Sequence, residues 1–168
     1  IASGHGVPAF YLAEQVGPTG QILAIDLSEH QIARARAIQG GQLPWLRFEC
    51  LDMRALPEHL PCFDRITGNL SVMFFRPNRF EAVEGLVEHL KPGGQLVLTF
   101  PSLGTFEPLW RRIDQEMAVH GLVAERQRLE AYLAERPSAE DARGWLERLH
   151  CSRIVVAQYP LGIATGTG

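Results

Sequence analysis

The first 27 residues decide the fold, and they read IASGHGVPAFYLAEQVGPTGQILAIDL. Gly4 and Gly6 form a Gly-x-Gly turn just before Pro8, a residue that suits the first turn of a helix because it lacks an N–H. The apolar run at 21–27 contains a single acid, Asp26, about 20 residues after Gly6. This offset is typical of a unit whose glycine turn faces a nucleotide and whose acid binds the ribose hydroxyls. The stretch therefore predicts a nucleoside-binding site.

Length and composition are those of one globular domain. The 168 residues are 46% hydrophobic and 21% charged, which is enough to build a buried core. The net charge of −3 does not favour a nucleic-acid partner, and no apolar run reaches the ~20 residues that span a bilayer. The 3 cysteines show no C-x-x-C spacing, and the 6 histidines show no metal-binding pattern. We therefore expect a cytoplasmic protein with reduced thiols, no metal, no nucleic acid and no membrane span.

Strands and helices alternate through the first hundred residues. We expect helices at 8–16, 28–39 and 80–90, and strands at 21–27, 45–50, 63–70 and 95–100. Ser28 and Gln31 have the spacing of a capping box, and the segment 91–94, Lys-Pro-Gly-Gly, breaks the third helix sharply. The alternation predicts an α/β fold with a doubly wound, mostly parallel Rossmann-like sheet and helices on both faces.

The apolar spacing also predicts which side chains are buried. In the strand at 45–50, Leu46, Phe48 and Cys50 share one face. In the helix at 80–90, four apolar residues follow the helical repeat: Phe80, Val83, Val87 and Leu90.

The pattern changes after residue 100. Helices are expected at 106–120 and 125–136, and a third begins at the capping pair Ser138 and Asp141. A strand is expected at 154–157, whereas 160–168 is too short and glycine-rich for one. A connection between two strands of such a sheet needs only one helix, and this region contains an extra one. We therefore interpret 101–137 as a helical insertion after the fifth strand that shapes a substrate pocket. One face of its first helix suits either core or substrate wall: Phe106, Trp110, Ile113 and Met117.

The ends of the chain bear on the domain assignment. Ile1 stands where a first strand should end, and a doubly wound sheet needs that strand near its centre. We therefore expect residues 1–168 to be a single domain that is truncated at both ends.

Five signals occur in order along the chain: the loop at 1–6, Asp26, the pair Asp52-Met53, Asn69 at the end of a strand, and the turn at 91–94. Together they resemble the class I S-adenosylmethionine-dependent methyltransferases, in particular the small-molecule branch with the ubiquinone and menaquinone biosynthesis enzymes. The resemblance covers roughly residues 1–100. It implies S-adenosylmethionine as cofactor, S-adenosylhomocysteine as product, and methyl transfer to a small, hydrophobic or aromatic molecule.

The resemblance also implies a set of cofactor contacts at the strand ends. The glycine loop would face the methionine part, Asp26 the ribose, and Asp52 with Met53 the adenine, while Asn69 and Leu70 would lie near the reacting methyl. The full set is Ala2, Ser3, Gly4, Gly6, Asp26, Leu27, Gln31, Asp52, Met53, Asn69 and Leu70. The chain departs from the family at Ala2, where glycine is usual, and at His5, where threonine is common.

Most of these residues also have a purely structural interpretation. Gly4 and Gly6 are also explained by a tight turn alone, and Asp26 by capping of a helix. Asp52 is also explained as a loop acid that caps residues 54–56, and Asn69 as a partner of loop backbone.

No general base can be identified from the sequence. Residues 71–75, Ser-Val-Met-Phe-Phe, contain only Ser71 as a weak proton acceptor, which favours a hydrophobic substrate or one that is already acidic. The weak catalytic candidates are His5, Asn69 and Tyr11, with His120 as a further one.

Two other functions remain open. Gly4, Gly6 and Ala9 also match the glycine pattern of an NAD-dependent oxidoreductase, with Asp26 as its ribose acid. The alanine at position 2 and the absence of an identified base also suit a non-catalytic methyltransferase-like binding domain. The helix pair at 106–136 would then offer a partner surface, or a homodimer contact in an active enzyme.

Overall fold

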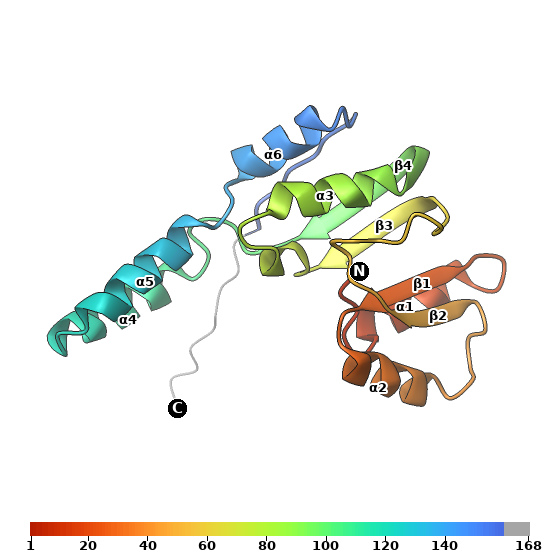
Figure 1. Cartoon of the computed structure of the whole chain (residues 1–168), viewed down its shortest axis with the longest axis horizontal. Coiled ribbons are helices and arrows are strands. Elements are labelled where there is room, and N and C mark those ends of the chain that lie inside the picture. The colour runs from red at the N-terminus through yellow and green to blue at the C-terminus, as the bar shows by residue number, and fades with distance from the viewer. Residues whose placement is uncertain (160–168) are drawn as a thin grey trace. The chain divides into compact units, whose positions relative to one another are not determined.

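The computed structural model describes residues 1–159, and the chain divides into two compact units, Ile1–Pro101 and Ser102–Gly168. The first unit alternates helices and strands (Figure 1). Its elements are α1 (Val7–Val16), β1 (Ile22–Asp26), α2 (Glu29–Gln39), β2 (Leu46–Cys50), β3 (Phe63–Asn69), the short 3-10 helix η1 (Val72–Phe74), α3 (Arg79–Glu88) and β4 (Leu90–Thr99). The predicted alternation is therefore confirmed, and the fold is α/β with parallel strands.

The strands form two parallel pairs. In the first pair Ile22 of β1 aligns with Leu46 of β2, and in the second Asn69 of β3 aligns with Thr99 of β4. The first residues of the chain lie between the two pairs (Figure 1): Ile1 N donates to Thr67 O at 2.8 Å. On the other side the N–H of Ser3 donates to Ile25 O at 2.9 Å. The loop at 1–6 therefore lies between the carboxyl ends of β1 and β3.

The first two helices begin and end within one residue of the expected positions. Pro8 lies in the first turn of α1, and Gly17 ends it by donating its N–H to Ala13 O. At the start of α2, the Ser28 hydroxyl accepts from the N–H of Gln31 at 3.3 Å. Only this half of the predicted capping box is present, because the N–H of Ser28 donates to Asp26 instead of to Gln31.

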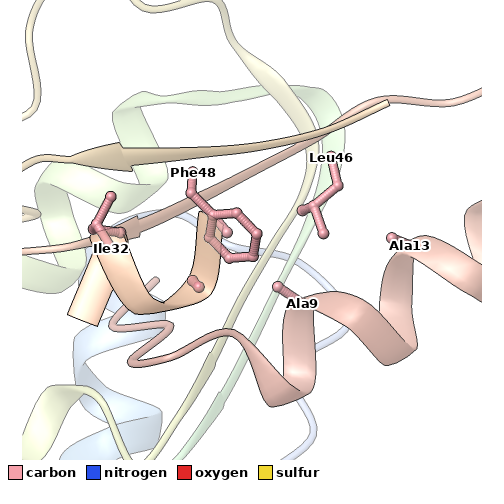
Figure 2. Packing of buried hydrophobic residues seen from close by; sticks show 7 residues of the cluster. Ala9, Ala13, Ile32, Leu46 and Phe48 are labelled. Atoms are coloured by element: carbon pink, nitrogen blue, oxygen red, sulfur yellow. The ribbon is translucent and has the colours of Figure 1, made fainter. Parts of the chain in front are cut away.

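The hydrophobic core of the first two strands is built from small residues on α1 and large ones on β2. Figure 2 shows Leu46 and Phe48 pointing from β2 toward Ala9 and Ala13 of α1. The prediction that these two β2 residues are buried is confirmed. Cys50, predicted on the same face, is exposed because it is the last residue of β2, where its thiol lies 3.4 Å from Leu27 O.

The predicted end of the third helix was wrong. Helix α3 ends at Glu88, and Leu90 already pairs with Phe63 as the first residue of β4. Of the four predicted positions Val83 is buried, whereas Phe80, Val87 and Leu90 are half-buried. The buried residues of α3 are Arg79, Ala82, Val83 and Leu86. The helix begins at Arg79, one residue earlier than expected, and it packs against β4 and η1, which determine the buried face.

The segment 91–94 was predicted as a break before the strand at 95–100 and is instead part of β4. Arg65 pairs with Gln95 whereas Phe63 pairs with Leu90, so the residues between form an irregularity in the ladder. Gly93 has a φ of +76°, which only glycine adopts without strain. The turn-forming residues were therefore recognised, but they form a bulge within β4 instead of a turn before it.

The second unit consists of α4 (Glu107–Val119), α5 (Val123–Ala134) and α6 (Ala139–Arg148). Helices α4 and α5 occupy the two helical stretches predicted in 101–137, and they pack against each other. The Arg136 guanidinium lies 5.1 Å from the Trp110 ring centroid and 5.4 Å from that of Tyr132. Neither helix has a fully buried residue, so the predicted apolar face of α4 is at most half-buried.

Two predictions concern the residues after α6. The capping pair Ser138 and Asp141 forms a complete capping box at the start of α6, as predicted. The strand predicted at 154–157 is wrong, because these residues have no strand pairing and Val155 is 84% exposed. Apolar alternation yields a strand only where a neighbouring strand supplies hydrogen-bond partners. Residues 160–168, for which no strand was predicted, lie outside the described residues.

Candidate functional site

A cavity of about 540 Å³ lies at the carboxyl ends of β1 and β2, beside the loop at 1–6. Its volume falls within the ~300–1,000 Å³ typical of small-molecule sites. The lining residues all belong to the first unit: Ala2, Gly4, Ile25, Asp26, Leu27, Gln31, Leu51, Asp52, Met53, Arg54, Ser71 and Phe75.

Asp26 joins three elements of the site. One carboxylate oxygen accepts from the N–H of Gly4 at 2.8 Å, and the other accepts from the N–H of Ser28 at 2.9 Å. A carboxylate has about four acceptor positions, so these two bonds leave capacity for a ligand diol at the cavity. Both predicted roles, a structural cap and a ligand acceptor, are therefore compatible with the same side chain.

The glycine loop contains two different kinds of glycine. Gly4 has a φ of +54° and no atom within 4 Å of an added Cβ, so its surroundings are open toward a ligand. At Gly6, with φ +96°, an added Cβ would lie 2.8 Å from Phe48 Cζ and 2.9 Å from Phe10 Cε2. Gly6 is therefore required by packing and does not line the cavity. Ala2, with a φ of +49°, adopts the backbone region that favours glycine.

Asp52 is held by a neighbour. The Arg54 Nε lies 2.9 and 3.0 Å from the two carboxylate oxygens, and Nη2 lies 2.6 Å from Oδ2. The N–H of Arg54 also donates to Oδ1 at 2.9 Å, so the structural interpretation of Asp52 as a cap of residues 54–56 is confirmed for Arg54. The Arg54 guanidinium holds the pKa of Asp52 below its usual range.

Two buried polar atoms at the cavity have no hydrogen-bond partner among the described residues. They are Gln31 Oε1 and Ser71 Oγ, and Ser71 is fully buried. An unpaired buried polar atom costs about 1–3 kcal/mol, a cost that a ligand or water removes on binding. These atoms and Asp26 give the cavity the acceptors that a polar ligand needs.

Several predicted site residues do not line the cavity. Asn69 Oδ1 accepts from the Thr99 hydroxyl at 2.5 Å, and the N–H of Leu70 donates to Thr99 O at 2.9 Å. Ser3 and the weak base candidates His5 and Tyr11 also lie outside the lining. His120 belongs to the second unit. The structure thus brings together seven of the implied contacts: Ala2, Gly4, Asp26, Leu27, Gln31, Asp52 and Met53.

Five lining residues were not predicted as contacts: Ile25, Leu51, Arg54, Ser71 and Phe75. Ile25, Leu51 and Arg54 lie within two residues of the predicted acids, so the strand-end position was the available signal. Within residues 1–159, no group of three or more side chains is arranged to hold a metal ion. No helix in this part of the chain is long and apolar enough to cross a bilayer.

Comparison with known proteins identifies the kind of domain to which this site belongs. Residues 1–94 match the family model described as "Methyltransferase domain". The tRNA (guanine(6)-N2)-methyltransferase of Thermus thermophilus is 34% identical over 57% of this chain and 31% of its own length. The ubiquinone/menaquinone biosynthesis C-methyltransferase UbiE of Pseudomonas putida strain GB-1 is 30% identical over 68% of this chain and 45% of its own length. The chain therefore spans less than half the length of these curated relatives.

A solved structure extends the likeness in fold beyond the matched residues. The plantazolicin methyltransferase BpumL, in complex with SAH, superposes with a TM-score of 0.62 over 89% of this chain and 53% of that chain. The two are 19% identical, so this likeness concerns the fold alone.

Proposed function

The chain belongs to the methyltransferase domain family, and on that premise we propose that its cavity binds S-adenosylmethionine and that S-adenosylhomocysteine (SAH) is the product. The observation that carries the proposal is the position of Asp26. Its carboxylate lies at the cavity, is oriented by the N–H groups of Gly4 and Ser28, and keeps acceptor capacity for two ribose hydroxyls.

The other lining residues fit the rest of this cofactor. Asp52 and Met53 would contact the adenine, and Ala2 and Gly4, with open space at Gly4, would face the methionine part. Gln31 Oε1 is a buried acceptor that has no partner among residues 1–159, and a ligand with several N–H and O–H donors would supply one. The proposed contacts outside the lining would act through position: Ser3 and Gly6 shape the loop, Asn69 is the last residue of β3, and Leu70 follows it directly.

The bound cofactor would supply an activated methyl group on its sulfonium. The protein then has to hold the acceptor in line with that methyl group, an effect of positioning that is worth up to ~7–11 kcal/mol in model reactions. Exclusion of water would help further, because charge is lost as the methyl group transfers. Leu51, Met53 and Phe75 provide apolar lining for this purpose.

We propose that the methyl acceptor is a small, hydrophobic or aromatic molecule that is already acidic. None of the candidate bases His5, Asn69 and Tyr11 lines the cavity, so an acceptor that needs no deprotonation by the protein fits best. The net charge of −3, with Lys91 as the single lysine, does not favour a nucleic-acid acceptor. The tRNA methyltransferase among the relatives makes tRNA the alternative acceptor to test.

The finer features of the predicted fold also stay proposals. We propose one domain over 1–168, with a doubly wound sheet that has helices on both faces and with 101–137 as an insertion at the substrate end. A homodimer through α4 and α5 is a further prediction, supported by the absence of fully buried residues in both helices.

Parallel calorimetric titrations with S-adenosylmethionine, SAH and NAD⁺ test the proposal. Micromolar binding of the first two ligands, without binding of NAD⁺, is the expected result. Binding of NAD⁺ alone would instead support the oxidoreductase. Binding of none of the three ligands would support the non-catalytic binding domain.

A further inference from the structure

Arg54 and Asp52 line the same cavity and are bonded to each other. The fork of Arg54 reaches both carboxylate oxygens, with Nη2 2.6 Å from Oδ2 and Nε 2.9 Å from Oδ1. The backbone N–H of Arg54 takes a further position on Oδ1 at 2.9 Å. The side chain of Asp52 is 30% exposed and that of Arg54 is 57% exposed, so the pair lies at the open side of the cavity.

These contacts use most of the acceptor capacity of Asp52. A carboxylate offers about four acceptor positions, and Arg54 donates to both oxygens through its side chain as well as to Oδ1 through its backbone. A nucleobase amine therefore does not meet a free carboxylate. It forms its own bond with Asp52 either at the one remaining acceptor position or in place of a guanidinium N–H, and in both cases it shares the carboxylate with Arg54.

We propose that Arg54 is a specificity-determining residue, whose guanidinium competes with the amine of the nucleobase for Asp52 and so weakens the preference of the site for adenine. This inference rests on the proposed function, because it requires the nucleoside to lie at Asp52. An exposed ion pair is weak, and the competition is therefore a modest effect that binding overcomes.

Two ligands separate the competition from other roles of Arg54. The first is SAH, and the second is the analogue of SAH with unsubstituted purine in place of adenine, which lacks only the amine. In the variant Arg54→Ala, the affinity for SAH is expected to rise roughly two- to fivefold, while that for the purine analogue stays unchanged. The double variant Asp52→Asn with Arg54→Ala is expected to lose this gain, because the amide no longer offers two carboxylate acceptors.

A matched variant controls for the lost charge. Arg47 lies in β2, is exposed and does not line the cavity. Arg47→Ala removes the same charge from the same region and is expected to leave the affinity for both ligands unchanged. Arg54→Lys keeps the charge but removes the guanidinium that contacts both carboxylate oxygens. Its affinity for SAH is expected to lie between those of the wild type and Arg54→Ala.

Calorimetry on the full chain gives outcomes that are distinguishable. Tighter binding of SAH alone by Arg54→Ala supports the inference. Equal affinity for SAH in the wild type and Arg54→Ala, weaker binding by the variant, or an equal gain for both ligands overturns it while leaving the proposed function intact. If the wild type does not bind SAH, the proposed function fails, and the inference fails with it.

Discussion

The N–H of Gly4 donates to Oδ2 of Asp26 over 2.8 Å, and this bond connects the glycine loop to the end of β1. The second oxygen of the same carboxylate accepts from Ser28 at the start of α2. One side chain therefore fixes the loop, the strand and the helix that surround the cavity. The site is oriented before any ligand binds, which reduces the cost of ordering it on binding.

Asp26→Asn is expected to lower the free energy of unfolding by about 1–2 kcal/mol, because the amide places an N–H₂ group against one of the two backbone donors. Urea denaturation of the variant and of the wild type measures the difference. An unchanged midpoint and slope would show that Asp26 does not hold the loop.

Ala2→Gly is expected to raise the free energy of unfolding by about 1 kcal/mol, since Ala2 has a φ of +49° where a Cβ is strained. Gly4→Ala is the reverse test and is expected to cost about 1–2 kcal/mol through the same backbone effect alone, because its Cβ would meet no atom within 4 Å. The urea denaturation midpoints of the two variants, compared with that of the wild type, test both predictions. A destabilised Ala2→Gly variant would contradict the left-handed backbone at position 2.

Gly6→Ala is expected to be more damaging than Gly4→Ala, at about 2–4 kcal/mol. The added Cβ would lie 2.8 Å from Phe48 Cζ and 2.9 Å from Phe10 Cε2, so a core ring must move in addition to the backbone strain. The double variant Gly6→Ala with Phe10→Leu should recover part of the loss, because the smaller side chain gives way. Equal stability of the two glycine variants would rule out the packing role.

The capping box of α6 predicts a dependence on pH. The Ser138 hydroxyl donates to Asp141 at 2.7 Å and the Ser138 N–H donates at 2.8 Å, which holds the pKa of Asp141 below its usual range. Because the pKa is lower in the folded state, this stabilisation is present above the ordinary carboxyl range and is lost as the pH falls through and below it. The melting temperature should therefore differ less between pH 7 and pH 3 for Asp141→Asn than for the wild type. The same difference in both proteins would show that the box does not couple to pH.

The local order of elements was predictable because short-range chemistry fixes it. Pro8 and Gly17 bound α1, and Ser28 and Gly40 bound α2, through caps that involve neighbouring residues only. The strand predicted at 154–157 failed because its formation depends on a partner strand, which its own residues do not encode.

The site shows the same division between local and non-local signals. Asp26 was identified because its distance from Gly6 reflects one structural unit. The engagement of Asp52 by Arg54 was only partly foreseen, since a cap of the following backbone was one interpretation but the side-chain fork was not. The role of Gly6 in packing against Phe48 depends on a contact between distant segments, and no local pattern encodes it.

Calorimetric titration of SAH against Asp26→Ala tests the central claim most directly. Asp64→Ala is the matched control, because Asp64 is an exposed acid near the start of β3 that pairs with Lys91 and does not line the cavity. We expect wild-type affinity in Asp64→Ala and an affinity at least about tenfold lower in Asp26→Ala, with circular dichroism confirming that both are folded. Wild-type affinity for SAH in a folded Asp26→Ala variant would contradict the proposed site.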